Sequence, residues 1–305
     1  MKDSLLIVGG SGFIGSHLAI KSLERGFKTT IVSFKEVTSE KKIKGISYIQ
    51  SDISNLSELK QKLLKKDFHY VINLSGYIDH SSYLLGGSSV IDVHFDGVQN
   101  LLKVLDWSIL KKFVQIGSSD EYGSHHAPQN EDMNELPISP YSFAKVASSK
   151  LLQMLHRTEN LPVVVFRLFL VYGNGQDRSR FIPQIIKGCL SGKNFPTSKG
   201  EQLRDFCHVE DITSGILDSL VINEVNGEII NLASGKPKSI REVIEIIQKL
   251  TNSGLPEFGE IAYRKGENMA LYANVEKAKK LLNWGPKIKL QEGLNEAIKF
   301  YSSES

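Results

Sequence analysis

The sequence predicts an α/β fold in which helices cover both faces of a parallel β-sheet. Short apolar runs alternate with amphipathic segments along the first half of the chain, and these runs lack the polar–apolar alternation of half-exposed strands. Strands that are apolar on both faces and separated by helices are typical of doubly wound parallel sheets. A glycine-rich turn between the first apolar run and the first amphipathic segment supports the same fold.

The elements follow this pattern in order. We expect six strands, at residues 4–10, 28–34, 46–53, 69–76, 111–119 and 162–173. The helices between them are expected at residues 15–26, 56–66, 90–107 and 139–157. After residue 173 the chain becomes polar and rich in turns, with further helices expected at residues 239–250 and 290–301. We therefore predict a large domain of residues 1–172 and a smaller mixed α/β domain of residues 173–305, with residues 205–235 crossing back to the first domain.

Composition excludes several classes of protein. The 305 residues are 23% charged and carry a net charge of +3, which does not favour nucleic acid or a membrane surface as a partner. No run approaches the roughly 18 apolar residues of a membrane span, and Arg167 interrupts the most apolar stretch. The two cysteines, Cys189 and Cys207, indicate neither a disulfide framework nor a metal site. We expect a cytoplasmic protein.

The turn "GGSGFIG" has glycines at positions 9, 12 and 15. Gly9 permits a tight turn, Gly12 lets the backbone approach a pyrophosphate, and Gly15 allows the helix to pack closely on the strand. The start of the helix, at Phe13 and Ile14, then offers free N–H groups to the phosphates. A glycine-rich corner alone is weak evidence, but the surrounding strand–helix pattern predicts a Rossmann-type dinucleotide-binding domain.

The second strand indicates which dinucleotide binds. An acidic residue at its end would bind a ribose 2′-hydroxyl and favour NAD. Ser33 stands there instead, with Lys35 two residues later, so the sequence favours NADP(H), although Glu36 could replace the acid and NAD stays the alternative. Asp52, after the third strand, is a candidate for the adenine amino group or for a helix cap.

Tyr141 and Lys145 lie four residues apart and therefore on one face of a predicted helix. A nearby ammonium should favour the phenolate and lower the tyrosine pKa, so that the phenol can exchange a proton with a sugar oxygen. Ser118 and Ser119 follow the fifth strand, where a hydroxyl can bind the reacting oxygen. Chance spacing and turn chemistry are the alternatives for these residues.

Together these segments resemble the extended short-chain dehydrogenase/reductase family over nearly the whole chain. The resemblance rests on "GGSGFIG", "SDI", "NLSG", "GSSDEYG", "PYSFAK", "FRLFLVYGNGQ", "QLRDFCHVEDI" and "NLASGKP". It implies activity on a nucleotide-activated sugar. The family asparagines in two of its patterns are replaced here by Leu170 and His94.

The resemblance also implies roles for particular residues. Tyr141 would be the acid/base, Lys145 its partner and a ribose ligand, and Ser118, four positions before the tyrosine of "YG", the third catalytic residue. Arg204 and Arg264 would hold the sugar nucleotide's diphosphate. The remaining predicted contacts are Ile53, Leu74, Ser75 and Gly76 with the dinucleotide, and Ser118, Ser119 and Asp120 with the substrate.

The reaction within the family is less constrained. Without a gap, the Thr–Asp/Ser–Glu pattern of 4,6-dehydratases falls on Ser118, Ser119 and Asp120, and a shift of one residue would place it on residues 119–121. "IGSSDEYG" is more similar to reductases of the GDP-4-keto-6-deoxymannose type. We therefore predict NADPH-dependent reduction of the C4 keto group of a nucleotide-linked 4-keto-deoxy sugar. A 4-epimerase or 4,6-dehydratase with tightly bound NAD, and a non-catalytic dinucleotide sensor, are the alternatives.

A homodimer is also predicted. Leu151, Leu152, Met154 and Leu155 give the helix at residues 139–157 more apolar surface than one core face needs. The family often pairs this helix with the one at residues 90–107 across a two-fold axis. Burial within the monomer is the alternative.

Overall fold

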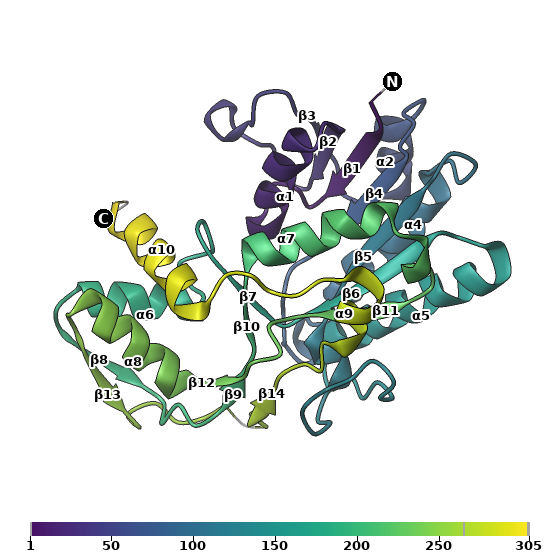
Figure 1. The fold of residues 1–305 in the computed structure, drawn as a ribbon. Coiled ribbons are helices and arrows are strands. Elements are labelled where there is room, and N and C mark those ends of the chain that lie inside the picture. Colours follow the sequence, from purple (N-terminus) through teal and green to yellow (C-terminus); the bar gives the residue numbers. More distant parts are fainter. Residues whose placement is uncertain (1, 265, 304–305) are drawn as a thin grey trace.

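The computed structural model describes residues 2–264 and 266–303, and in this part of the chain seven strands form one parallel sheet (Figure 1). The strand order is β11-β6-β5-β4-β1-β2-β3, so the winding direction reverses between β1 and β4. The strands are β1 Ser4–Val8, β2 Lys28–Ser33, β3 Ser47–Gln50, β4 Tyr70–Asn73, β5 Lys112–Ser118, β6 Val163–Leu168 and β11 Ile229–Leu232. In such sheets ligands bind at the carboxyl ends of the strands beside this reversal. The doubly wound prediction is confirmed.

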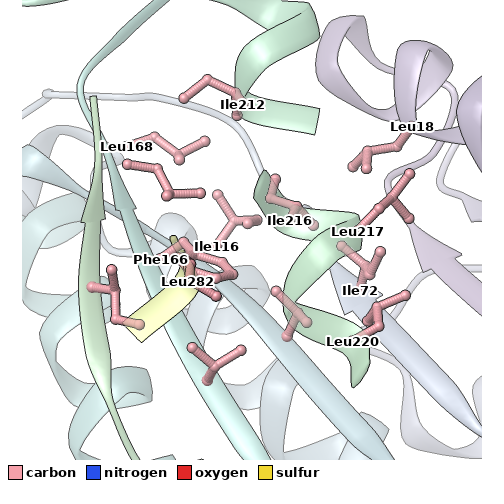
Figure 2. Close-up of a cluster of buried hydrophobic side chains, with 14 of the residues drawn as sticks. Leu18, Ile72, Ile116, Phe166, Leu168, Ile212, Ile216, Leu217, Leu220 and Leu282 are labelled. Atoms are coloured by element: carbon pink, nitrogen blue, oxygen red, sulfur yellow. The ribbon is translucent and has the colours of Figure 1, made fainter. Parts of the chain in front are cut away.

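Helices cover both faces of the sheet. One face packs against α1 Phe13–Glu24 and α7 Val209–Asp218, whose leucines and isoleucines join Ile72 and Phe166 of the strands in one buried core (Figure 2). The opposite face forms a second core with helices from the middle of the chain. These are α2 Leu56–Leu63, α4 Gly97–Val104 and α5 Pro140–Glu159, and the short helix α3 Ser89–Ile91 contacts α5. Neighbouring residues along one strand, such as Val71 and Ile72, therefore enter different cores.

The smaller lobe holds a third core between three helices, α6 Phe181–Leu190, α8 Ile240–Thr251 and α10 Leu290–Ser303. Short strands complete the lobe and its junction with the sheet. They are β7 Leu170–Tyr172 paired with β10 Phe206–His208, β8 Asn194–Thr197 paired with β13 Leu255–Phe258, and the ladder of β12 Lys238–Ser239, β9 Leu203–Arg204 and β14 Ala270–Leu271. No helix within the described residues combines the length and apolar character needed to cross a bilayer.

The chain enters the larger lobe twice after residue 173. Residues 209–232 supply α7 and the edge strand β11, within the segment that the sequence analysis expects to cross back. A second return was not predicted: α9 Glu276–Leu282 packs on β11, and Trp284 joins the same core. The smaller lobe is therefore built from separated stretches of the last third of the chain.

Several predicted elements differ from those observed. The strand expected at residues 162–173 is broken at Phe169, because β6 pairs within the large sheet while β7 pairs with β10. The helix expected at residues 90–107 contains a π-helical turn, Asp92–Asp96, and ends at Val104. Helices α6, α7 and α9 were missed. On α5, Leu152 is fully buried and Leu151 and Leu155 pack against the monomer core, so the homodimer stays a prediction.

His17 of α1 joins the two lobes. Its Nδ1 lies 2.6 Å from Glu210 Oε1, and its Nε2 lies 2.8 Å from the carbonyl oxygen of Asn174. Both partners accept hydrogen bonds, so both ring nitrogens must carry protons. Burial opposes this charge, but the hydrogen bonds to Glu210 and Asn174 outweigh burial and raise the pKa of His17 above its ordinary value. This contact favours the imidazolium form of His17.

Replacing His17 with glutamine is expected to lower the free energy of unfolding most at acidic pH. The folded-state pKa is raised, so the stabilisation is complete below the ordinary value of 6.5 and is lost as pH rises through the folded-state pKa. The pKa of Glu210 is lowered to about 2, so its carboxylate stays ionised throughout. Urea unfolding of both proteins between about pH 5 and pH 9 measures the difference. A difference that grows with pH would contradict this assignment.

Candidate active site

A cavity of about 1390 Å³ lies between the lobes at the carboxyl ends of the strands. Ligand pockets are typically about 300–1,000 Å³, so this cavity is larger than an ordinary ligand pocket. Its walls include every residue predicted to bind the dinucleotide: Gly9, Gly12, Phe13, Ile14, Gly15, Ser33, Lys35, Asp52, Ile53, Leu74, Ser75, Gly76, Tyr141 and Lys145. Ser118, Arg204 and Arg264 line the same cavity, whereas Ser119 and Asp120 do not.

The glycine turn forms a cradle at the start of α1. Gly9 has a φ of +77°, and its N–H donates to the carbonyl oxygen of Val32. A Cβ on Gly15 would lie 2.5 Å from the carbonyl oxygen of Gly9, so only glycine lets the helix approach the turn. Gly12 is the N-cap residue, no side chain caps α1, and its first turn has no acid. The cradle therefore fits a pyrophosphate on the N-terminus of the helix.

The end of β2 has no carboxylate in the cavity wall. Ser33 is buried, and its hydroxyl donates to the carbonyl oxygen of Lys35 over 2.9 Å. Lys35 itself is exposed and lines the cavity, and Glu36 is exposed and lies outside the cavity lining. These positions leave the cofactor preference of the sequence analysis untested.

The two alternatives for Asp52 are resolved by neighbouring residues. Asn55, whose side chain accepts a hydrogen bond from the N–H of Glu58, caps α2. Asp52 Oδ1 accepts from the N–H and hydroxyl of Ser54, and the residue also lines the cavity. Asp52 therefore does not cap α2, and its contact with the adenine amino group stays a prediction.

Tyr141 and Lys145 lie in the first two turns of α5, which Ser139 caps. The Lys145 ammonium donates to the carbonyl oxygen of Ile116 over 2.7 Å and lies 5.9 Å from the centre of the Tyr141 ring. Burial lowers the pKa of Lys145 to about 8. Ser118, at the end of β5, forms a hydrogen bond with Tyr141. The structure thus brings the three predicted catalytic residues together at one point of the cavity.

The expected direction of the Tyr141 pKa shift is wrong. Burial raises the pKa of Tyr141 above its ordinary value of 10.0, and the nearby charge of Asp120 adds to this rise. The hydrogen bond with Ser118 and the charge of Arg180 offset it only in part. Without a bound dinucleotide, Tyr141 therefore keeps its proton at neutral pH.

The Glu121 side chain is buried and forms hydrogen bonds only within the described part of the protein. It is fully buried, its Oε1 accepts from the N–H of Ser118 over 2.9 Å, and its Oε2 accepts from Arg167 Nε over 3.0 Å. The shifted alignment would make Glu121 the dehydratase glutamate, but both oxygens of its carboxylate are already engaged inside the protein. Asp120 is partly exposed and lies 3.7 Å from His80 Nε2, and Ser119 is buried. Their predicted substrate contacts stay predictions.

The far end of the cavity carries further charge. Arg204 pairs with Glu267, and burial lowers the pKa of Arg204 from its ordinary value. Arg264 is exposed on the cavity wall. Glu267 and Arg180, which were not predicted, also line the cavity. Both residues lie in polar, turn-rich segments, and this composition could have marked these segments as candidates for the cavity wall.

A family model described as the NAD dependent epimerase/dehydratase family matches residues 5–233. The chain belongs to this family. A UDP-glucuronate 4-epimerase of Thermodesulfobacterium geofontis is 30% identical to this chain, and the alignment covers 96% of this chain and 94% of the epimerase.

Two solved structures also resemble this epimerase/dehydratase family member. One is a UDP-N-acetylglucosamine 4-epimerase of Methanobrevibacter ruminantium M1 in complex with UDP-N-acetylmuramic acid. It superimposes with a TM-score of 0.89 at 27% identity, and the match covers 100% of both chains. A dTDP-glucose 4,6-dehydratase of Bacillus anthracis, in complex with NAD, has a TM-score of 0.84 at 25% identity, over 99% of this chain and 97% of the other. These relatives favour the epimerase or dehydratase alternative over the predicted 4-ketoreductase.

Proposed function

We propose that this protein is a nucleotide-sugar 4-epimerase that retains NAD(H) between turnovers. The observation that carries the proposal is the meeting of Ser118, Tyr141 and Lys145 in the same cavity as the glycine cradle. The epimerase relatives support it, and the engagement of Glu121 with Arg167 argues against a dehydratase.

The chain's own residues account for binding and for proton transfer. Arg204 and Arg264 bind the diphosphate of the substrate, which requires Arg204 to exchange Glu267 for phosphate oxygens. A bound nicotinamide dinucleotide supplies hydride transfer at C4 of the sugar. Tyr141 would take the proton of the C4 hydroxyl as that oxygen becomes a carbonyl, and would return the proton when the hydroxyl is formed again. Ser118 orients the same oxygen, and closure between the lobes excludes water.

NADPH-dependent reduction of a 4-keto sugar is the second candidate. The observation that favours it is the wall at the end of β2, where Lys35 is exposed in the cavity and no carboxylate is present. A phosphate on the ribose 2′ position would find a cation and no repelling charge there. This candidate predicts a cofactor that leaves after each turnover.

The deciding experiment identifies what the purified protein carries and produces. The protein is denatured and the released dinucleotide is analysed by chromatography, and the native protein is incubated with UDP-glucuronate and UDP-N-acetylglucosamine. Retained NAD(H) with a 4-epimer formed without added cofactor would support the epimerase. If the protein instead consumes NADPH when given a 4-keto sugar, the epimerase proposal is wrong and the protein is a reductase. Dinucleotide binding without turnover would favour a sensor.

Replacing Ser33 with aspartate is expected to shift the dinucleotide preference towards NAD(H). A carboxylate at the end of β2 would repel a 2′-phosphate and accept a hydrogen bond from a 2′-hydroxyl. We expect the affinity for NADPH to fall about tenfold or more relative to that for NADH, because like charges oppose binding. Calorimetric titration of both dinucleotides measures the ratio, with Ser33→Asn as the uncharged control. An unchanged ratio would show that this position does not face the ribose.

A further inference from the structure

His94 lies in the π-helical turn Asp92–Asp96, between α3 and α4. This turn is closed by a hydrogen bond from the N–H of Gly97 to the carbonyl oxygen of Asp92. Single π turns inside helices are frequent at functional sites, because the widened turn redirects one side chain. Here the turn lies on the cavity wall, and His94 is one of its lining residues.

Three parts of the fold fix the His94 ring. Its edge-to-face contact with the Tyr141 ring has a centroid distance of 5.1 Å and an interplanar angle of 84°. The ring lies against the main chain of Gly76, where a Cβ would come within 2.1 Å of His94 Cε1. On the main chain, the hydroxyl of Ser148 on α5 donates to the His94 carbonyl oxygen over 2.5 Å. His94 therefore connects the loop after β4 to the helix that carries Tyr141.

The hydrogen bonds of the ring define its tautomer. Nε2 lies 2.8 Å from the carbonyl oxygen of Tyr77, which only accepts hydrogen bonds, so Nε2 carries a proton. Burial and the charge of Lys145 lower the pKa of His94 to about 3, so the ring is neutral. Nδ1 is then an acceptor. His94 is 3% exposed, and its Nδ1 is buried without a hydrogen-bond partner in the described part of the chain.

An unpaired buried acceptor destabilises a protein unless something donates to it. The surroundings of the ring indicate the donor. A Cβ on Gly76 would come within 2.6 Å of Cε1, Nε2 and Nδ1, so this edge of the ring lies against the loop predicted to run along the dinucleotide. Tyr141 and Lys145, the second of them a predicted ribose ligand, border the same part of the cavity.

We propose that His94 Nδ1 accepts a hydrogen bond from a ribose hydroxyl of the bound dinucleotide. His94 then binds cofactor through one nitrogen while the other holds the ring to the loop after β4. The same contact presses the ring against Tyr141, so a correctly seated cofactor and a correctly oriented Tyr141 depend on one side chain. The inference rests on the proposed function only for the dinucleotide and does not require a particular reaction.

Three substitutions separate the two ring nitrogens. His94→Asn places an amide oxygen near the position of Nδ1 but does not reach Tyr77. His94→Gln reaches the carbonyl oxygen of Tyr77 but has no acceptor at the level of Nδ1. His94→Phe keeps an aromatic ring against Tyr141 and removes both polar atoms.

The test titrates NAD⁺ and NADH into each variant after removal of bound dinucleotide. His94→Gln and His94→Phe are expected to raise Kd about two- to tenfold, the effect of one neutral hydrogen bond, while His94→Asn stays within about twofold of the wild type. Thermal unfolding of each apo variant reports whether the fold is preserved. His80→Phe is the matched control, because the His80 ring also contacts Tyr141 edge-on, at 5.7 Å, and His80 is not among the residues lining the cavity.

Two outcomes would overturn the proposal. Unchanged affinity in His94→Phe would show that Nδ1 does not bind the dinucleotide, as would equal losses in His94→Asn and His94→Gln. Binding is measured without turnover, so the two proposals fail separately. The expected affinity pattern in a protein that converts no nucleotide sugar would overturn the epimerase and leave the role of His94 intact.

Discussion

Tyr141→Phe is expected to lower kcat about 10²- to 10⁴-fold, the range that one general acid–base group contributes. The ring stays packed against His94, and only the hydroxyl that forms the hydrogen bond with Ser118 is lost. Affinity for the dinucleotide should therefore change much less than kcat. Steady-state rates with whichever of UDP-glucuronate and UDP-N-acetylglucosamine the wild type converts, together with dinucleotide titration, measure the two effects separately.

The pKa of Tyr141 sharpens this expectation. Burial raises it, so the apo protein holds a protonated phenol through neutral pH.

Ser118→Ala should lower kcat less than Tyr141→Phe, because Ser118 orients the reacting oxygen without exchanging its proton. Full turnover by the Tyr141→Phe protein would assign proton transfer to another group and refute the mechanism.

Arg167→Met is expected to lower the free energy of unfolding by about 3–5 kcal/mol, the cost of leaving a buried charge without its partner. Arg167 and Glu121 are both fully buried, with Arg167 Nη2 3.0 Å from Glu121 Oε2 and 2.7 Å from Glu135 Oε1. Glu135 keeps a second partner, since Lys150 Nζ lies 2.7 Å away. The loss therefore falls on Glu121, and urea unfolding at neutral pH measures it.

The double variant Arg167→Met/Glu121→Gln provides the control. Glutamine can still accept the hydrogen bond from the Ser118 N–H, and no uncompensated charge stays at position 121. The double variant should therefore be more stable than Arg167→Met alone. If the single variant loses less than about 1 kcal/mol, the pair is not the buried anchor that its geometry indicates.

This network connects stability to the active site. Glu121 holds the main chain of Ser118 at the end of β5, and Arg167 holds Glu121 from the neighbouring strand β6. In the sequence, Arg167 only interrupts an apolar stretch. Its partner is 46 positions away, and no local pattern connects two charges at that separation. The structural role of Glu121 therefore cannot be recognised from local sequence patterns.

The parts of the site that were predicted share a local origin. Gly9, Gly12 and Gly15 recur within one strand–turn–helix unit, and Tyr141 and Lys145 lie one helical turn apart. Short-range spacing of this kind survives folding unchanged. It was enough to predict which residues of the glycine turn and of α5 line one cavity, and the resemblance to a family added Ser118 to them.

The pKa of Tyr141 shows the limit of local spacing. Its distance from Lys145 in the sequence predicted a lowered pKa, but burial under the surrounding elements decides the direction. Burial depends on which distant segments cover a side chain, and no spacing rule contains that information.

The sequence by itself determined the doubly wound sheet, the glycine cradle and the Tyr141–Lys145 pair, because periodicity and spacing act over a few residues. Only the tertiary structure decided that β6 ends where β7 begins, that α7, β11 and α9 return to the larger lobe, and that Glu121 is engaged by Arg167. It also decided that His94 lies in a π turn between Gly76 and Tyr141. These features arise from contacts between segments far apart in the chain, where packing and desolvation outweigh local preference.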